Sequence, residues 1–219
     1  MSDQRGVVAA LAEQAGRGEP VVLASVVRVV GAAYRGIGAR MLVRADGSTV
    51  GMVSAGCLEA DLIAHADRVR AAGEPVVITY DTRADDEVVW GLGLGCDGIV
   101  EVLLEPLAPA RATALAAFLG DVLAREQVTV LATVIRAEGE GAPRPGARVL
   151  VGVPDSATAR DGDWGDGTAL AHVLADPPSS TPDVGYLNTH STYAAASAAV
   201  AYEVVAPPVR LVICGSGPD

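Results

Sequence analysis

The chain has 219 residues, half of them apolar, which is enough for one large domain or two small ones with a substantial core. Its formal net charge of −11 argues against a nucleic-acid-binding protein, which needs a basic face. The sequence contains no lysine, so all 16 basic residues are arginine, and P-loop, Schiff-base and general-base lysines are excluded.

The sequence also bears on the compartment. No apolar run reaches the roughly 20 residues that cross a bilayer, and no basic-then-apolar signal opens the chain. Three widely spaced cysteines do not form the pattern of a disulfide framework. We therefore expect a cytoplasmic protein without a membrane span.

Hydrophobic periodicity predicts one helix and then three strands at the start of the chain. The helix covers residues 5–16, and the strands cover 21–28, 40–44 and 50–53, with a turn at Asp46-Gly47. Together with the elements that follow, this order predicts a mixed α/β domain.

A second helix is predicted over Leu58–Ala72, with apolar residues on one face and Gly73 closing its last turn. Strands over 76–80 and 99–105 follow it. A third helix over 111–125 then leads into the second half of the chain.

The chain contains an internal repeat. Residues 22–43 match residues 130–151 at an offset of 108 without gaps, and 11 of the 22 positions are identical. Such a unit predicts a strand–loop–strand element that is used twice, within repeat units of about 21–107 and 128–205. The second pair of strands is accordingly expected over 128–135 and 147–151.

After the repeat, the composition predicts little regular structure. Residues 154–183 are rich in Asp, Gly, Pro and Ser, and we expect a loop there with about one helical turn near Leu170. A short last strand is predicted over Tyr202–Val205.

The end of the chain differs from what precedes it. Residues 209–219 form an apolar strand that runs into the turn Gly215-Ser216-Gly217, as at the start of a dinucleotide-binding βαβ unit. We therefore expect residues 1–208 to form one domain and 209–219 to begin a truncated Rossmann-like domain. NAD(P) or another nucleotide would bind at Gly215 and Gly217 of that second domain.

Two of the three cysteines are surrounded by glycine. Cys57 follows Ser54-Ala55-Gly56, and Cys96 follows Gly95 at the end of a stretch with four glycines in eight residues. Glycine lets the backbone approach a bound group closely, and a thiolate binds soft metals or attacks electrophiles. Cys57 precedes a predicted helix, whose positive N-terminal end would stabilise a thiolate.

The structural alternative for these cysteines is a buried apolar role, which we prefer for Cys214 in its apolar strand. A zinc site is disfavoured because the paired Cys-x-x-Cys spacing is absent. The second repeat has Trp164-Gly165 in place of Gly56-Cys57, so we expect any chemistry to lie in the first copy.

Four arginines fall within 17 residues ahead of Cys57, namely Arg28, Arg35, Arg40 and Arg44. In so acidic a chain they indicate a local anion site, for which arginine provides a bidentate grip. The alternative for Arg40 is a structural ion pair, because Arg148 recurs at the matching place in the second copy.

With these motifs, the sequence resembles the XdhC/CoxI family of xanthine dehydrogenase maturation proteins. The resemblance rests on two cysteine motifs in order, Ser54-Ala55-Gly56-Cys57-Leu58-Glu59 and Gly93-Leu94-Gly95-Cys96-Asp97-Gly98, and on the arginine segment before them. The strand and Gly-x-Gly turn of residues 209–219 resemble the start of that family's C-terminal Rossmann domain. Ala55 and Asp97 stand where glycine is usual.

The resemblance implies a chaperone that binds molybdenum cofactor (molybdopterin), assists its sulfuration and passes it to apo xanthine dehydrogenase or a related molybdenum hydroxylase. A cysteine desulfurase would donate the sulfur, and the chain would form a homodimer. Cys57 and Cys96 would then contact molybdenum or its sulfur, and Arg35 and Arg40 would bind the pterin phosphate. The loops around the thiols would supply Ser54, Gly56 and Gly95.

Two other classes of function stay open from the residues alone. The chain could be part of an NAD(P)-dependent oxidoreductase with redox-active cysteines. It could also be a scaffold in which the repeat matters and the cysteines are core residues.

Overall fold

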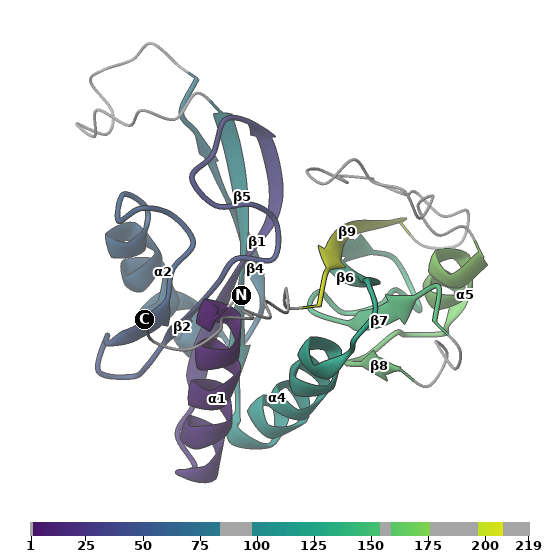
Figure 1. Cartoon of the computed structure of the whole chain (residues 1–219), viewed down its shortest axis with the longest axis horizontal. Helices are drawn as coiled ribbons and strands as arrows, with labels where there is room; N and C mark the ends of the chain where they lie inside the picture. The colour runs from purple at the N-terminus through teal and green to yellow at the C-terminus, as the bar shows by residue number, and fades with distance from the viewer. Residues whose placement is uncertain (1, 84–97, 154–158, 176–196, 208–219) are drawn as a thin grey trace, which may run out of the picture.

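A computed structural model of the chain describes residues 2–83, 98–153, 159–175 and 197–207 (Figure 1). The helices within these residues are α1 (Ser2–Gly16), α2 (Glu59–Ala72), α4 (Pro109–Ala124) and α5 (Thr168–Ala175). The strands are β1 (Val21–Gly31), β2 (Arg40–Val43), β3 (Thr49–Gly51), β4 (Val76–Asp81), β5 (Gly98–Leu107), β6 (Thr129–Glu138), β7 (Arg148–Val151), β8 (Arg160–Asp161) and β9 (Ser197–Val205). The predicted mixed α/β class is confirmed.

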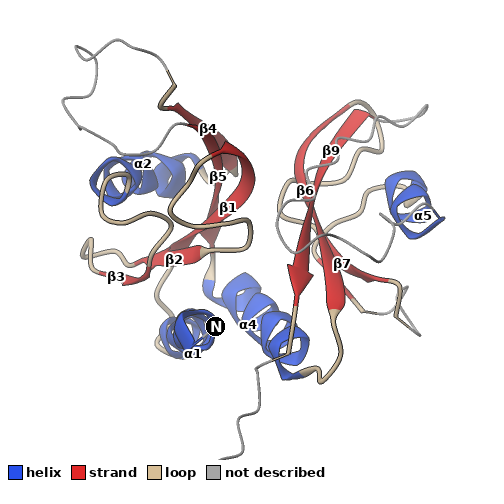
Figure 2. Cartoon of the chain, turned by 45° about the horizontal axis from the view of Figure 1, so that its top comes forward, coloured by secondary structure: helices blue, strands red, loops and turns tan. Residues whose placement is uncertain are grey.

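The strands form two antiparallel sheets. The first has the order β3-β2-β1-β5-β4, and the second has the order β8-β7-β6-β9. Figure 2 shows α2 on the outer side of the first sheet, α5 on the outer side of the second, and α1 and α4 together at one end. No helix in the described ranges is both long and apolar enough to cross a membrane.

The two sheets repeat the same strand pairing. Val22 lies opposite Val43 in β1–β2, and Val130 lies opposite Val151 in β6–β7, which is the sequence offset of 108. The register irregularity within β1 recurs at the corresponding point of β6. The strand–loop–strand repeat seen in the sequence is thus two copies of one local structure.

Buried apolar side chains hold the layers together. One cluster fastens α1 and α4 to both sheets, and it contains the fully buried Leu11, Leu115, Leu23 and Leu131. A second cluster lies between α2 and the first sheet, and a third lies between α5 and the second sheet. Each such leucine contributes about 1.5–3 kcal/mol of burial free energy, so both sheets share one core at the α1–α4 end.

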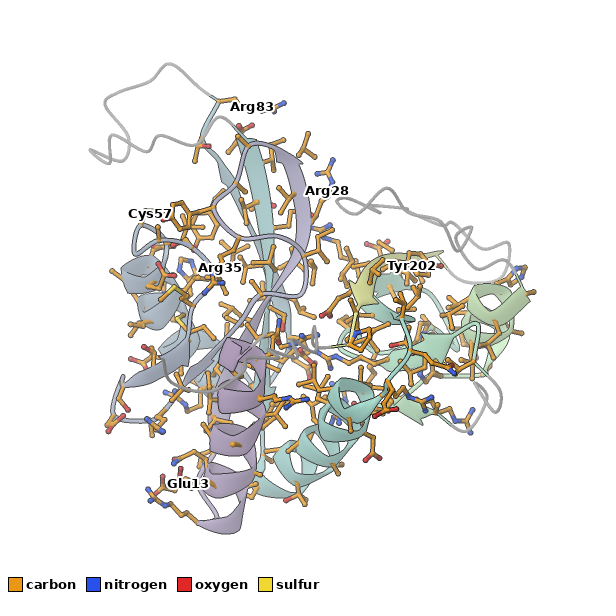
Figure 3. All side chains as sticks on the ribbon, viewed as in Figure 1. Glu13, Arg28, Arg35, Cys57, Arg83 and Tyr202 are labelled. Atoms are coloured by element: carbon orange, nitrogen blue, oxygen red, sulfur yellow. The ribbon has the colours of Figure 1, made fainter. Side chains whose placement is uncertain are left out.

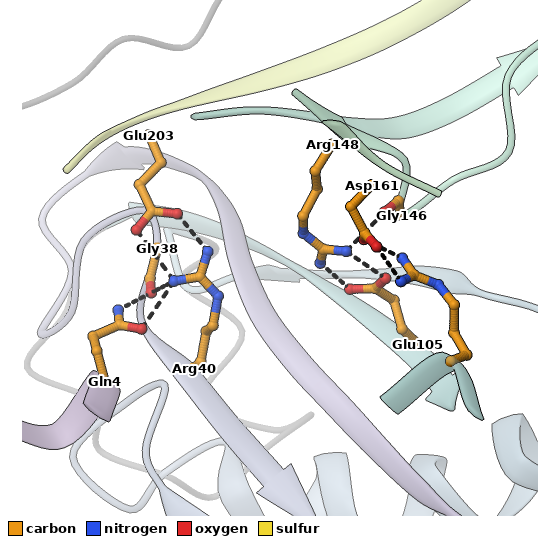
Figure 4. A network of polar contacts seen from close by, with 9 residues as sticks. Gln4, Gly38, Arg40, Glu105, Gly146, Arg148, Asp161 and Glu203 are labelled. Carbon is orange, nitrogen blue, oxygen red and sulfur yellow. Dashed lines mark hydrogen bonds and ion pairs between the residues drawn. The ribbon is translucent and has the colours of Figure 1, made fainter. Parts of the chain in front are cut away.

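Two ion pairs cross between the sheets (Figure 4). Arg40 of the first sheet binds Glu203 of the second, with Nη1–Oε1 and Nη2–Oε2 distances of 3.1 and 2.5 Å. Arg148 of the second sheet grips both carboxylate oxygens of Glu105 in the first, with an Nη1–Oε1 distance of 3.0 Å. Because each sheet supplies one cation and one anion to the other, the two sheets balance their buried charges only together.

Two predicted segments were wrong in extent. β9 starts at Ser197 rather than Tyr202, because the alanine-rich stretch has little strand preference of its own and is held by pairing with β6. The loop predicted over 154–183 contains the two-residue strand β8 and the eight-residue helix α5. Residues 209–219, where a Rossmann-like domain was expected to start, lie outside the described residues.

Candidate functional site

Cys57 lies in the loop that joins β3 to α2. The Ser54 hydroxyl oxygen accepts hydrogen bonds from the backbone N–H groups of Gly56, at 3.2 Å, and of Leu58, at 3.1 Å. Gly56 has φ of 108°, a conformation that side chains other than glycine rarely adopt. The serine and glycine of the motif thus shape the turn that places Cys57 just before Leu58, the N-cap of α2.

Glu59 closes the same loop from the first turn of α2. Its Oε1 accepts the backbone N–H groups of Val53, at 3.2 Å, and Ser54, at 2.8 Å, and its Oε2 accepts the Ser54 hydroxyl. Burial raises the pKa of Glu59, but these hydrogen bonds outweigh it and hold the pKa below the usual 4.5. The sequence analysis did not identify this role, although a serine followed by a glutamate at a helix start resembles a capping box.

A first prediction concerns this lock. Because the folded-state pKa of Glu59 is lowered, its carboxylate contributes stability above pH 4.5 that is lost as the pH falls through the folded value. We expect Glu59→Gln to be less stable than wild type by about 1 kcal/mol at pH 7, since the group is partly exposed, and the difference to shrink below pH 4.5. Urea unfolding at pH 7 and at pH 3.5–4.5 measures it.

The control is Glu13→Gln, which changes an exposed carboxylate on α1 and should leave the stability nearly unchanged. A stability difference between wild type and Glu59→Gln that stays constant from pH 7 to pH 3.5 would contradict the assignment.

Cys57 lines a small pocket on the α2 side of the first sheet. Its side chain is partly buried and contacts the apolar cluster beneath α2. The cavity volume is about 20 Å³, which is room for about one water molecule. The lining residues are Ala33, Tyr34, Arg35, Val53, Ser54, Cys57, Leu58, Tyr80, Thr82 and Val100. The pocket therefore brings together Cys57, Ser54 and Arg35 from the set of predicted site residues.

Tyr80 forms a buried polar wall of this pocket. Its hydroxyl donates to Asp61 Oδ2 at 2.6 Å. Burial and this hydrogen bond both raise the pKa of Tyr80, so the side chain stays a neutral phenol. His65 Nδ1 lies 3.2 Å from the same Asp61 oxygen, so the carboxylate is held by two side chains.

Arg35 lines the Cys57 pocket and a second, larger cavity. The second cavity measures about 230 Å³ and is also lined by Gln4, Leu123 and Glu203. Figure 3 shows Arg35 and Cys57 on the same side of the first sheet, close to the start of α2. Arg35 is thus the cation that the two cavities share.

Arg40 does not join Arg35, and its expected contact with a cofactor phosphate is corrected here. It is 5% exposed, both of its Nη atoms bind Glu203, and it lines the contact between the two sheets. A guanidinium enclosed in such a pair has no open face for a cofactor. The structural ion pair, which was the alternative from the repeat, is the arrangement observed.

The second cysteine motif starts beside the pocket. Gly95 and Cys96 lie outside the described residues, as do Gly215 and Gly217. The strand ends next to them are joined, because Thr82 N–H donates to the Gly98 carbonyl at 2.9 Å and Gly98 N–H donates to Thr82 Oγ1 at 3.1 Å. Within the described part of the chain, no group of three or more His, Cys, Asp or Glu side chains could hold a metal ion.

The second copy of the repeat has a core residue in the corresponding place. Trp164 is 5% exposed and packs in the cluster under α5. Its indole N–H donates to the backbone oxygen of Arg148 at 3.2 Å. Where the first copy presents a thiol at a loop, the second therefore buries an indole.

The chain was compared with known protein families. Residues 14–81 match the XdhC and CoxI family. These residues include the end of α1, the first three strands, α2 and the Cys57 loop. The resemblance drawn from the motifs is confirmed over this segment.

Two curated relatives carry related descriptions. The chain is 42% identical over 96 residues to a protein of Bacillus subtilis (strain 168) described as a probable xanthine dehydrogenase subunit, which covers 42% of this chain and 28% of that protein. It is 31% identical over 109 residues to "Molybdenum cofactor insertion chaperone PaoD" of Escherichia coli (strain K12), which covers 50% of this chain and 33% of that protein. The matched segments thus span a third or less of either relative.

A solved structure has a similar fold. A crystal structure described as a xanthine dehydrogenase from Bacillus halodurans superposes with a TM-score of 0.59 and 24% identity. The match covers 92% of this chain and 53% of the other. Both sheets and the helices between them therefore occur together in a known fold.

Proposed function

We propose that this chain binds molybdenum cofactor and assists its sulfuration and insertion into apo xanthine dehydrogenase or a related molybdenum hydroxylase. The observation that carries the proposal is a thiol and a guanidinium in one pocket, Cys57 and Arg35, within the segment that matches the XdhC and CoxI family. A thiolate suits a soft, sulfur-bound metal, and a guanidinium suits a phosphate. A cysteine desulfurase would supply the sulfur.

The size of the pocket limits which part of the cofactor enters it. A cavity of about 20 Å³ admits a group the size of a terminal sulfur and not a pterin ring. Cys57 would contact molybdenum or its sulfur there, in the turn held by Ser54 and Gly56. Arg35 also faces the cavity of about 230 Å³, so its guanidinium would bind the phosphate of the same cofactor from that side.

Cys96 and Gly95 complete the proposed site. Cys96 precedes Gly98 by two residues, and two residues of chain span at most about 7 Å. Gly98 is hydrogen-bonded to Thr82, a residue of the pocket wall. The covalent chain therefore supports Cys96 as a second thiol for the same cofactor.

Several parts of the proposal rest on the sequence alone. A domain over residues 1–208, a following Rossmann-like domain that holds NAD(P) or another nucleotide at Gly215 and Gly217, a homodimer and a cytoplasmic location remain predictions. The described residues neither include the Gly-x-Gly turn nor bear on the compartment.

The test is molybdopterin binding by the purified full-length protein, measured by native mass spectrometry and by titration with isolated cofactor. We expect Cys57→Ser and Cys96→Ser each to weaken binding at least 10-fold, because each removes a proposed contact to molybdenum or its sulfur. Arg35→Gln should weaken binding by about 10-fold, because a charge-assisted contact to phosphate contributes about 1.5–3 kcal/mol.

Matched controls are Cys214→Ser for the thiols and Arg17→Gln for the arginine, since Arg17 is exposed on α1 beside Glu13. Both controls should bind as wild type does. Unchanged binding in Cys57→Ser and Cys96→Ser would remove the proposed ligands. Binding of NAD(H) without molybdopterin, together with reversible thiol oxidation, would favour the oxidoreductase interpretation instead.

A further inference from the structure

One layer of charged side chains between the two sheets is not balanced in the way the layer nearer the helices is. Near α1 and α4, each repeat arginine has a carboxylate of its own, as Arg40 with Glu203 and Arg148 with Glu105. The arginines Arg28 and Arg136 form the next pair in the repeat. They share one acid.

The strand registers explain the difference. Arg28 lies opposite Glu101 in the β1–β5 pairing. Arg136, its repeat counterpart, lies opposite Ala199 in the β6–β9 pairing. The second sheet therefore lacks a carboxylate where the first sheet has one, and Arg136 reaches across to Glu101.

Both cations approach the same oxygen atom. Arg28 Nη1 lies 3.7 Å from Glu101 Oε1, and Arg136 Nη2 lies 3.3 Å from it. Glu101 Oε2 is buried and has no hydrogen-bond partner among the described residues, so the carboxylate does not divide its two oxygens between the guanidiniums. Two positive charges thus lie close together with a single negative charge between them.

The two guanidiniums are open to small solutes. The side chain of Arg28 is 30% exposed and that of Arg136 is 46% exposed, whereas that of Glu101 is 8% exposed. Figure 3 shows Arg28 on the side of the first sheet that faces the second sheet, and Cys57 on the α2 side. The Arg28–Arg136 pair is therefore distinct from the Cys57 pocket.

We infer that Arg28 and Arg136 form a second, separate binding site for a phosphate-type oxyanion, held between the two sheets. The excess positive charge attracts an anion, and two guanidiniums from opposite sheets present N–H donors that match tetrahedral oxyanions. An anion bound there supplies the charge that a carboxylate at position 199 would have supplied. The site is independent of the proposed cofactor function.

The test is a calorimetric titration of the full chain with inorganic phosphate at low ionic strength, and in a second arm with methyl phosphate. We expect saturable binding of one phosphate, weakened by added NaCl because exposed charges are screened. Similar binding of both ligands would identify the oxyanion as the recognised group. Tighter binding of methyl phosphate would point to an organic phosphate ester as the natural ligand.

Two variants make the test sharp. Ala199→Glu restores the missing carboxylate and should weaken phosphate binding at least 10-fold while the protein stays folded. Arg136→Gln should weaken it similarly. The matched control is Ala114→Glu, which makes the same charge change on the exposed side of α4 and should bind phosphate as wild type does.

The inference is overturned if wild type shows no saturable phosphate binding. It is also overturned if Ala199→Glu binds phosphate as tightly as Ala114→Glu does. Neither result depends on molybdopterin, so failure here leaves the proposed cofactor function standing, and the reverse also holds.

Discussion

Replacing Arg148 with methionine is expected to lower the free energy of unfolding by about 3–5 kcal/mol, because it leaves a buried carboxylate without its cation. Arg148 is 1% exposed and Glu105 is 3% exposed. Burial lowers the pKa of Arg148, but the charge of Glu105 outweighs it and the pKa is raised, so the guanidinium stays charged. Urea or guanidinium unfolding followed by circular dichroism measures the loss.

The double variant Arg148→Met with Glu105→Leu separates a broken pair from a missing one. Because apolar side chains of similar volume often replace a buried ion pair at little cost, we expect it to recover most of the loss. The control Arg17→Met removes an exposed arginine and should change stability by about 0.5 kcal/mol or less. Single and double variants of equal stability would show that the pair does not join the sheets in this way.

The second large effect is expected for Gly51→Ala, which should lower the free energy of unfolding by about 2–4 kcal/mol. Gly51 ends β3 with φ of 83°, and an added Cβ would collide with the backbone oxygen of Arg40 and with the Val7 side chain. The backbone oxygen belongs to β2 and cannot move without disturbing the sheet. Val7 packs α1 onto the core, so the collision reaches both layers.

The control for this substitution is Gly120→Ala. Gly120 lies inside α4, and nothing stands within 4 Å of the Cβ that alanine would add. The substitution should therefore stabilise the protein by about 0.5–1 kcal/mol through helix propensity. Chemical denaturation of both variants measures the contrast. Equal stability of Gly51→Ala and wild type would contradict the close approach of β3, β2 and α1.

Local chemistry made much of the first half readable. Gly73 was expected to close α2, and it does so with φ of 74° and an N–H bond to the Val69 carbonyl. The strand ends near Asp46-Gly47 and the start of α2 beside the Cys57 loop also fall close to the predicted positions. In each case a short motif of glycine, aspartate or apolar spacing determines the backbone within a few residues.

The sequence by itself determined the mixed α/β class, the repeated strand pair and the glycine-bounded turn that carries Cys57, because these depend on local backbone preference and periodicity. Only the tertiary structure decided which arginine faces which acid. Arg35 and Arg40 are five residues apart, yet one lines the thiol pocket and the other is buried against Glu203. That choice is set by how the two sheets meet, and contacts between residues 163 positions apart leave no local pattern in the chain.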